Sequence, residues 1–137
     1  MDNRIMEILH TYSLRKTPIR AQMLELFLNA NQALGQQELE LQMDTADRIT
    51  VYRTLRTFEQ KGIIHQAIDG TGKMKYALCE ANCDEHAHHD SHAHFHCEVC
   101  NKTVCMEQIP IPHITNPLGY QVHQIHLLLS GTCKTCQ

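Results

Sequence analysis

Two matched cysteine pairs constrain this chain more than any other feature of its sequence. Cys97 and Cys100 form one Cys-x-x-Cys motif, and Cys133 and Cys136 form a second. Each motif presents two thiolates from one tight turn, and two motifs complete the all-sulfur tetrahedral shell typical of structural zinc. Buried or disulfide-bonded cysteines are the alternative. The odd total of seven cysteines and the lack of a signal peptide in residues 1–10 favour zinc in a reduced, cytoplasmic compartment.

Charge and histidine content divide the chain into two parts with different roles. Residues 1–80 carry ten Lys/Arg and ten Asp/Glu, whereas residues 81–137 carry two and five and hold nine of the eleven histidines. A hydrophobic content of 42% is sufficient for globular cores, and no apolar run approaches the length of a bilayer span. We therefore expect a soluble protein with no membrane contact.

Helical periodicity followed by a hairpin pattern predicts a winged helix-turn-helix in the first part. Apolar residues recur at helical spacing in four segments, and apolar-polar alternation flanks a Gly-rich turn after them. The helical segments are residues 3–14, 18–28, 35–43 and 47–61, and the hairpin covers residues 63–78. Several helices followed at once by a hairpin are typical of this DNA-binding architecture.

The helix expected at residues 47–61 has one face rich in hydrogen-bond donors. Val51, Leu55 and Phe58 share its apolar face. The candidate DNA-contact residues lie opposite or on the flank, and they are Thr50, Tyr52, Arg53 and Arg56. Such donors suit the phosphates and base edges of double-stranded DNA. A solvated amphipathic helix would show the same periodicity, and the balanced charge of this half does not itself indicate nucleic-acid binding.

Three segments of the chain together resemble the ferric uptake regulator (Fur) family. They read RITVYRTLRTFEQKGII at residues 48–64, HAHFHCEVC at residues 92–100 and GTCKTC at residues 131–136. The resemblance implies an α+β fold, with a winged-helix DNA-binding domain at residues 1–80, a His-rich linker at 81–92 and a small α/β dimerisation domain at 93–137. It also implies a homodimeric repressor of metal homeostasis genes that binds a palindromic operator.

The same resemblance implies a regulatory metal site between the two domains. Mapped onto this chain, its ligands are His65 in the hinge, Cys79 after the wing, and His92 and His94. Cys105 stands where the family usually has an acidic ligand, so it is a further candidate. Three nitrogens and one sulfur favour Zn2+. This set is similar to the zinc uptake regulator (Zur) branch, whereas Fe2+ or Mn2+ would place the chain among iron- or peroxide-responsive regulators.

Each regulatory candidate also has a simpler interpretation. His65 could be a packed strand histidine, and Cys79 and Cys105 could be small buried hydrophobic residues. His92 and His94 occupy alternate strand positions, which predicts one shared face. The segment 80–90, with Cys83, His86, His88 and His89, could buffer metal or serve as a solvated linker.

An enzyme or a metal buffer is the other class of function that such ligands permit. A zinc hydrolase needs a general base beside the ion, and neither H-E-x-x-H nor H-x-E with P-C-x-x-C is present. We therefore expect no catalysis and no small organic substrate. Pro110, Pro112 and Pro117 limit regular helix after residue 109, and residues 120–129 are expected to form a strand.

Overall fold

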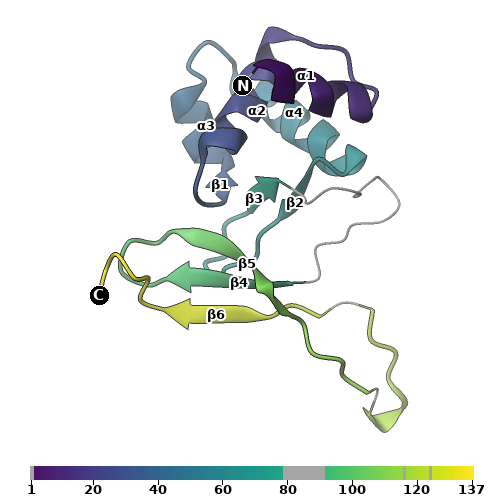
Figure 1. Ribbon diagram of the computed structural model, residues 1–137, viewed down its shortest axis with the longest axis vertical. Helices are drawn as coiled ribbons and strands as arrows, with labels where there is room; N and C mark the ends of the chain where they lie inside the picture. The colour runs from purple at the N-terminus through teal and green to yellow at the C-terminus, as the bar shows by residue number, and fades with distance from the viewer. Residues whose placement is uncertain (1, 79–91, 116, 124) are drawn as a thin grey trace.

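The computed structural model describes residues 2–78, 92–115, 117–123 and 125–137. Helices gather at one end of the molecule, and two three-stranded sheets follow them (Figure 1). Among the described residues, no helix is long and apolar enough to cross a membrane. The α+β fold predicted from the sequence is confirmed.

Four helices form the first part of the chain, at the places that periodicity predicts. They are α1 (Asp2–Thr11), α2 (Pro18–Asn29), α3 (Gln36–Gln42) and α4 (Arg48–Lys61). Local chemistry sets where α2 and α4 begin, because Thr17 Oγ1 accepts from the backbone N–H of Arg20 at 3.2 Å and Asp47 Oδ1 accepts from that of Thr50 at 2.7 Å. The helical bundle is held by one contiguous apolar core.

The apolar face of α4 lies in the centre of that core. Val51, Leu55 and Phe58 are fully buried and pack with side chains from α1, α2 and α3. Thr54 completes the buried face by donating its hydroxyl to the carbonyl of Thr50 at 2.8 Å. Because one face is fixed by packing, the opposite face of α4 points outward.

Gly62 ends α4 in a left-handed conformation, with φ 91. Its N–H donates to carbonyls of the last helical turn, so a side chain here would strain the cap. We expect Gly62→Ala to lower the free energy of unfolding by about 1–2 kcal/mol, measured by urea denaturation. Gly131→Ala is the matched control, since a Cβ there would lie 3.7 Å from the Phe95 ring, an ordinary contact. An equal decrease in the free energy of unfolding for Gly62→Ala and Gly131→Ala would contradict the explanation by a strained helix cap.

The first sheet forms the wing and joins it to the helices. Its strands are β1 (Leu34–Gly35), β2 (Ile64–Gln66) and β3 (Lys75–Leu78), in the order β1-β3-β2 and all antiparallel. The hairpin of β2 and β3 confirms the prediction for residues 63–78. β1 was not predicted, because two residues are too few to show alternation.

The second sheet holds the cysteine-rich part of the chain. Its strands are β4 (His92–Cys97), β5 (Thr103–Pro110) and β6 (Leu128–Gly131), in the order β5-β4-β6. β5 runs antiparallel to β4, and β6 runs parallel to it. The described residues between β5 and β6 extend away from the sheets and include a short 3-10 turn, Pro117–Gly119 (Figure 1).

The strand expected over residues 120–129 is wrong for most of its length. The described residues from 120 to 127 form no strand, and Tyr120 and Val122 are exposed. Alternation marks a strand only where a neighbouring strand can pair with it, and pairing with β4 begins at Leu128 opposite His94. The expectation that the prolines leave little room for helix agrees with the short turn observed.

Candidate metal centres and DNA-contact face

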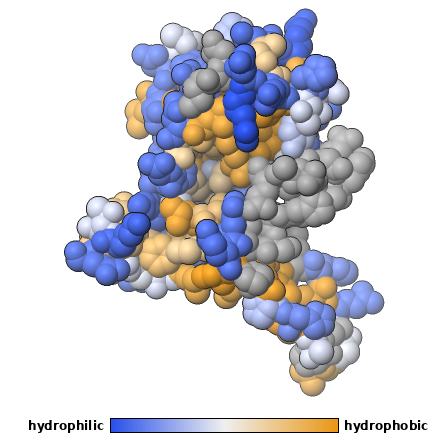
Figure 2. All heavy atoms as spheres, viewed as in Figure 1, coloured by the Kyte–Doolittle hydropathy of each residue, from blue (hydrophilic) through white to orange (hydrophobic). Residues whose placement is uncertain are grey.

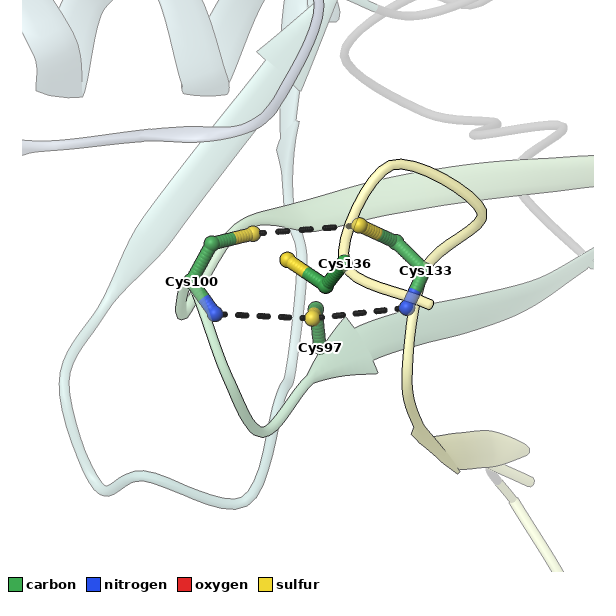
Figure 3. A group of neighbouring side chains, drawn as sticks. All are labelled: Cys97, Cys100, Cys133 and Cys136. Atoms are coloured by element: carbon green, nitrogen blue, oxygen red, sulfur yellow. Dashed lines mark hydrogen bonds between the residues drawn. The ribbon is translucent and has the colours of Figure 1, made fainter.

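The four cysteines of the two Cys-x-x-Cys motifs form one cluster. Their sulfur atoms all lie within 4.8 Å of one another, and the Sγ atoms of Cys100 and Cys133 are 4.0 Å apart. Figure 3 shows the four side chains converging from two places, the end of β4 with the turn after it and the loop at the C-terminal end of the chain. All four carry free thiols. Four sulfur donors at this spacing fit a tetrahedral zinc ion.

Strand pairing explains why motifs 33 or more residues apart meet. β6 runs parallel to β4, with Gly131 opposite Cys97, so both chains leave the sheet at the same end. The backbone N–H of Glu98 donates to the Gly131 carbonyl at 2.8 Å and holds the two exits together. Cys133 follows two residues later, and its backbone N–H donates to Cys97 Sγ within the cluster.

Backbone hydrogen bonds prepare one of these thiols for metal. The N–H groups of Cys100 and Cys133 donate to Cys97 Sγ at 3.5 and 3.4 Å and lower the pKa of Cys97 to about 6. The neighbouring Cys133 thiol and burial raise the pKa of Cys136 to about 12, because a further negative charge is unfavourable there. A divalent cation removes that penalty, so the donor set fits a thiolate-bound metal.

A second cluster lies between the two sheets. It contains His65 from β2, His94 from β4 and Cys105 from β5, and their ligand atoms all lie within 4.8 Å of one another. Sγ of Cys105 is 3.6 Å from Nε2 of His65, and the imidazole rings of His65 and His94 have centroids 5.8 Å apart. Both histidines are buried, with exposed fractions of 3% and 8%. Two imidazoles and a thiol at this spacing fit a borderline-soft divalent metal.

The register of the strands places this cluster. His94 and Cys105 are direct partners across the antiparallel pair of β4 and β5, so both side chains lie on one face of the second sheet. His65 reaches that face from the first sheet, where it pairs with Ala77 of β3. The cluster therefore joins the wing of the first part to the second sheet.

The structure does not place the side chains of the other two predicted regulatory ligands, Cys79 and His92. Cys79 lies outside the described residues, as do Cys83, His86, His88 and His89. The backbone of His92 belongs to β4, but the pairing with β5 shifts between His92 and Ala93. A shift of this kind interrupts strict alternation, so the alternation of β4 does not test whether His92 shares a face with His94, and its role as a ligand stays a prediction.

A buried polar network beside this cluster was not found from the sequence. It consists of Asp69, Lys75, His96 and Thr103, and it is called the Asp69 network below. Asp69 is 3% exposed, although carboxylates are seldom buried. The one available signal was the alternation of His94 and His96 on β4, which places both on one face. Asp69 gave no signal, because it stands in a polar turn sequence.

The outward face of α4 carries the predicted DNA-contact residues. Tyr52, Arg53 and Arg56 are exposed, and Thr50 is half-buried next to its cap. Arg56 lies 3.5 Å from Glu59 in an exposed i,i+3 pair, which is a weak and easily replaced contact. Arg53 is exposed as well and lies three residues before Arg56 on α4. The donors of this face are thus available to a phosphate or a base edge.

Comparisons with known proteins agree with this architecture. The model of the Ferric uptake regulator family matches residues 11–129. The Ferric uptake regulation protein of Staphylococcus epidermidis is 31% identical over 98% of this chain and 95% of its own length. The crystal structure of holo XcZur superposes with a TM-score of 0.67 at 24% identity, covering 99% and 98% of the two chains. A zinc uptake regulator complexed with zinc and DNA superposes with a TM-score of 0.63 at 20% identity, covering 98% and 91%.

The fold and the two clusters define a class of protein: metal-dependent transcriptional regulators, in which a winged helix is joined to a small metal-binding sheet. The chain belongs to the ferric uptake regulator family. Members of this family are DNA-binding regulators of transcription and not enzymes.

Proposed function

We propose that this protein is a zinc-responsive repressor of metal homeostasis genes in the cytoplasm. The observation that carries the proposal is the cluster of His65, His94 and Cys105, because a thiolate beside two imidazoles selects a borderline-soft ion such as Zn2+ over harder ones. Cys79 and His92 remain our proposed additional ligands. The cluster of Cys97, Cys100, Cys133 and Cys136 would hold a second, structural Zn2+.

Regulation would follow from the place of the first cluster between the sheets. A bound ion would supply bonds that join His65 to His94 and Cys105 at once. Holding that ion would fix β2, and with it α4, relative to the second sheet. A ligand shifts such an equilibrium only through its higher affinity for one arrangement. We place the DNA-binding domain at residues 1–80 and the dimerisation domain at residues 93–137, separated by the linker at 81–92.

The proposed active form is a homodimer on a palindromic operator. Exposed apolar residues lie along the end of β5 and the extended segment after it, and they are Ile109, Ile114, Leu118, Tyr120 and Val122. In Figure 2 much of the helical end is coloured hydrophilic, and hydrophobic residues are visible on the second sheet. A second copy covering such residues would place two α4 helices at a fixed distance, which the metal-loaded form would match to two half-sites.

An iron- or peroxide-responsive regulator is the second candidate. It is favoured by the relatives at 31% identity, which are named ferric uptake regulation proteins. In that case the regulatory site would hold Fe2+ or Mn2+, and the proposal for the structural zinc would stand unchanged.

The test is selection of DNA by each metal. Protein with an empty regulatory site is mixed with a pool of random-sequence duplexes, with Zn2+, Mn2+ or, without oxygen, Fe2+, and bound duplexes are sequenced after repeated enrichment. Enrichment of one palindromic sequence with Zn2+ at the lowest free concentration supports the zinc repressor. Enrichment with Fe2+ or Mn2+ but not Zn2+ moves the protein to the second candidate.

Arg53 is the residue of α4 whose loss should weaken DNA binding most. We expect Arg53→Ala to reduce affinity for the selected duplex roughly 10- to 100-fold, because a base or phosphate contact of arginine contributes about 1–3 kcal/mol. Fluorescence anisotropy at fixed salt measures the change. Arg4→Ala, an exposed arginine on α1, is the control and should bind normally. Equal DNA affinity of Arg53→Ala and Arg4→Ala would show that Arg53 of α4 does not contact the DNA.

A further inference from the structure

The Asp69 network connects the turn after β2 to the second sheet through buried polar contacts. Oδ2 of Asp69 accepts from the Thr103 hydroxyl at 2.9 Å and lies 3.1 Å from Nζ of Lys75. Its other oxygen accepts from the backbone N–H of Thr71 at 3.0 Å. Burial alone would raise the pKa of Asp69, but the hydrogen bonds from Thr71, Thr103 and Lys75 hold it well below its usual value. The carboxylate is therefore charged and fully engaged.

The direction of the hydrogen bonds extends the network to His96. A threonine hydroxyl has one hydrogen, and Thr103 donates it to Asp69. Nδ1 of His96, 3.0 Å from Thr103 Oγ1, must then be the donor in that contact. The chain of hydrogen bonds runs from β4 through β5 to Asp69, and a side chain without a hydroxyl at position 103 would break it.

Two more contacts join the same parts of the molecule. The backbone N–H of Ala33 donates to the Thr103 carbonyl at 2.7 Å, and Nζ of Lys75 donates to the Asn101 carbonyl at 3.1 Å. The first bond links the residue before β1 to the start of β5, and the second links β3 to the loop between β4 and β5. The first part of the chain is thus joined to the second sheet by hydrogen bonds that use none of the proposed metal ligands.

The register places this contact next to the regulatory cluster. Thr103 pairs with His96 and Cys105 pairs with His94, so the two cross-strand pairs are neighbours on one face of β4 and β5. Asp69 follows His65 by four residues and reaches the first pair, while His65 reaches the second. The wing is attached to the second sheet at two adjacent points, one of hydrogen bonds and one of metal ligands.

We propose that Asp69 and Thr103 are positioning residues that hold His65 opposite His94 and Cys105 before metal binds, and so set the metal concentration at which the regulator responds. The inference rests on the proposed function of that cluster. The apparent affinity of a site falls with the fraction of molecules in the competent arrangement. Removing a buried, charge-assisted hydrogen bond reduces that fraction, so we expect roughly a tenfold loss of apparent affinity.

The test compares Thr103→Val with Thr103→Ser. Valine keeps the shape of threonine but removes the hydroxyl, whereas serine restores it. Zn2+ is titrated into protein that retains its structural zinc, in competition with a chromophoric chelator, and Co2+ absorption reports the ligand set. Thr103→Val should bind the regulatory ion about tenfold more weakly, with the same stoichiometry and the same Co2+ spectrum. Thr103→Ser should resemble the wild type.

Measurements on protein that lacks the regulatory ion distinguish a failure of this inference from a failure of the proposed function on which it rests. Small-angle scattering is measured on protein that retains its structural zinc but lacks the regulatory ion. Thr103→Val should show a larger radius of gyration than Thr103→Ser, because the wing is held less firmly against the second sheet. If wild-type protein binds no second ion, the proposed function fails, and the scattering comparison still decides whether the network holds the parts together. Wild-type affinity and scattering in Thr103→Val would overturn the inference, even if its melting temperature fell.

A second variant keeps the test decisive if Thr103→Val does not fold. Asp69→Asn keeps the size of the side chain, removes its charge and weakens both the Thr103 and Lys75 contacts. It should lower the Zn2+ affinity at least as much as Thr103→Val does. Asp44→Asn, an exposed carboxylate in the turn before α4, is its control and should leave Zn2+ affinity unchanged. Equal Zn2+ affinities in these two variants would overturn the inference.

Discussion

Replacing Cys133 with Ser should unfold the second sheet and leave the helical part of the chain folded. The described residues of the second sheet and its loops bury Ala93, His94, His96, Cys97, Thr103 and Cys133. This set contains one aliphatic side chain, which cannot stabilise a sheet of three strands. A structural zinc site contributes apparent binding energy on the order of 10 kcal/mol, more than many small domains have in total.

The measurements are zinc content and amide hydrogen exchange. Wild-type protein should lose one zinc on substitution, and the amides of β4 and β6 should exchange much faster, while those of α2 and α4 remain protected. Val99→Ser is the control, because Val99 is exposed in the same loop and is not part of the cluster. Full zinc content and protected β4 amides in Cys133→Ser would show that the cysteine cluster is not structural.

Features with a strong local signal were predictable from the sequence. The helices α2 and α4 have their apolar periodicity, their capping residues Thr17 and Asp47, and Gly62 at the end of α4, all of which agree with one another. The Cys-x-x-Cys spacing indicated two thiols in each turn. The two motifs together also predicted one shared four-sulfur site, but they did not predict the parallel pairing of β4 with β6 that brings the two turns together.

Features that depend on distant pairing were not predictable in the same way. Cys105 was a further candidate only through the resemblance to the family, because its own neighbourhood shows ordinary alternation; its register opposite His94 is what brings it to His65. Asp69 resembles any turn aspartate until Thr103 of another sheet lies against it. The apolar residues of segment 120–127 alternate as a strand would, but no strand of the described chain pairs with them. In each case the missing information is which segment lies opposite.

His65→Ala should abolish the metal dependence of DNA binding while leaving the structural zinc in place. His65 is the one described member of the regulatory cluster that comes from the wing side, so without it a bound ion can no longer join the first part to the second sheet. Allosteric coupling of this kind is typically 5- to 150-fold, and we expect a loss of roughly 100-fold in DNA affinity at saturating Zn2+. Anisotropy with the selected duplex and zinc content per chain are the measurements.

The control for His65→Ala is His10→Ala, an exposed histidine at the end of α1. It should keep two zinc ions per chain and normal DNA binding, whereas His65→Ala should keep one.

Cys105→Ser then tests the identity of the metal, because it removes the soft donor and leaves both imidazoles. A large loss of Zn2+ affinity with little change for Mn2+ supports a thiolate-dependent zinc site. Metal-dependent DNA binding that survives in both His65→Ala and Cys105→Ser would place regulation elsewhere in the chain.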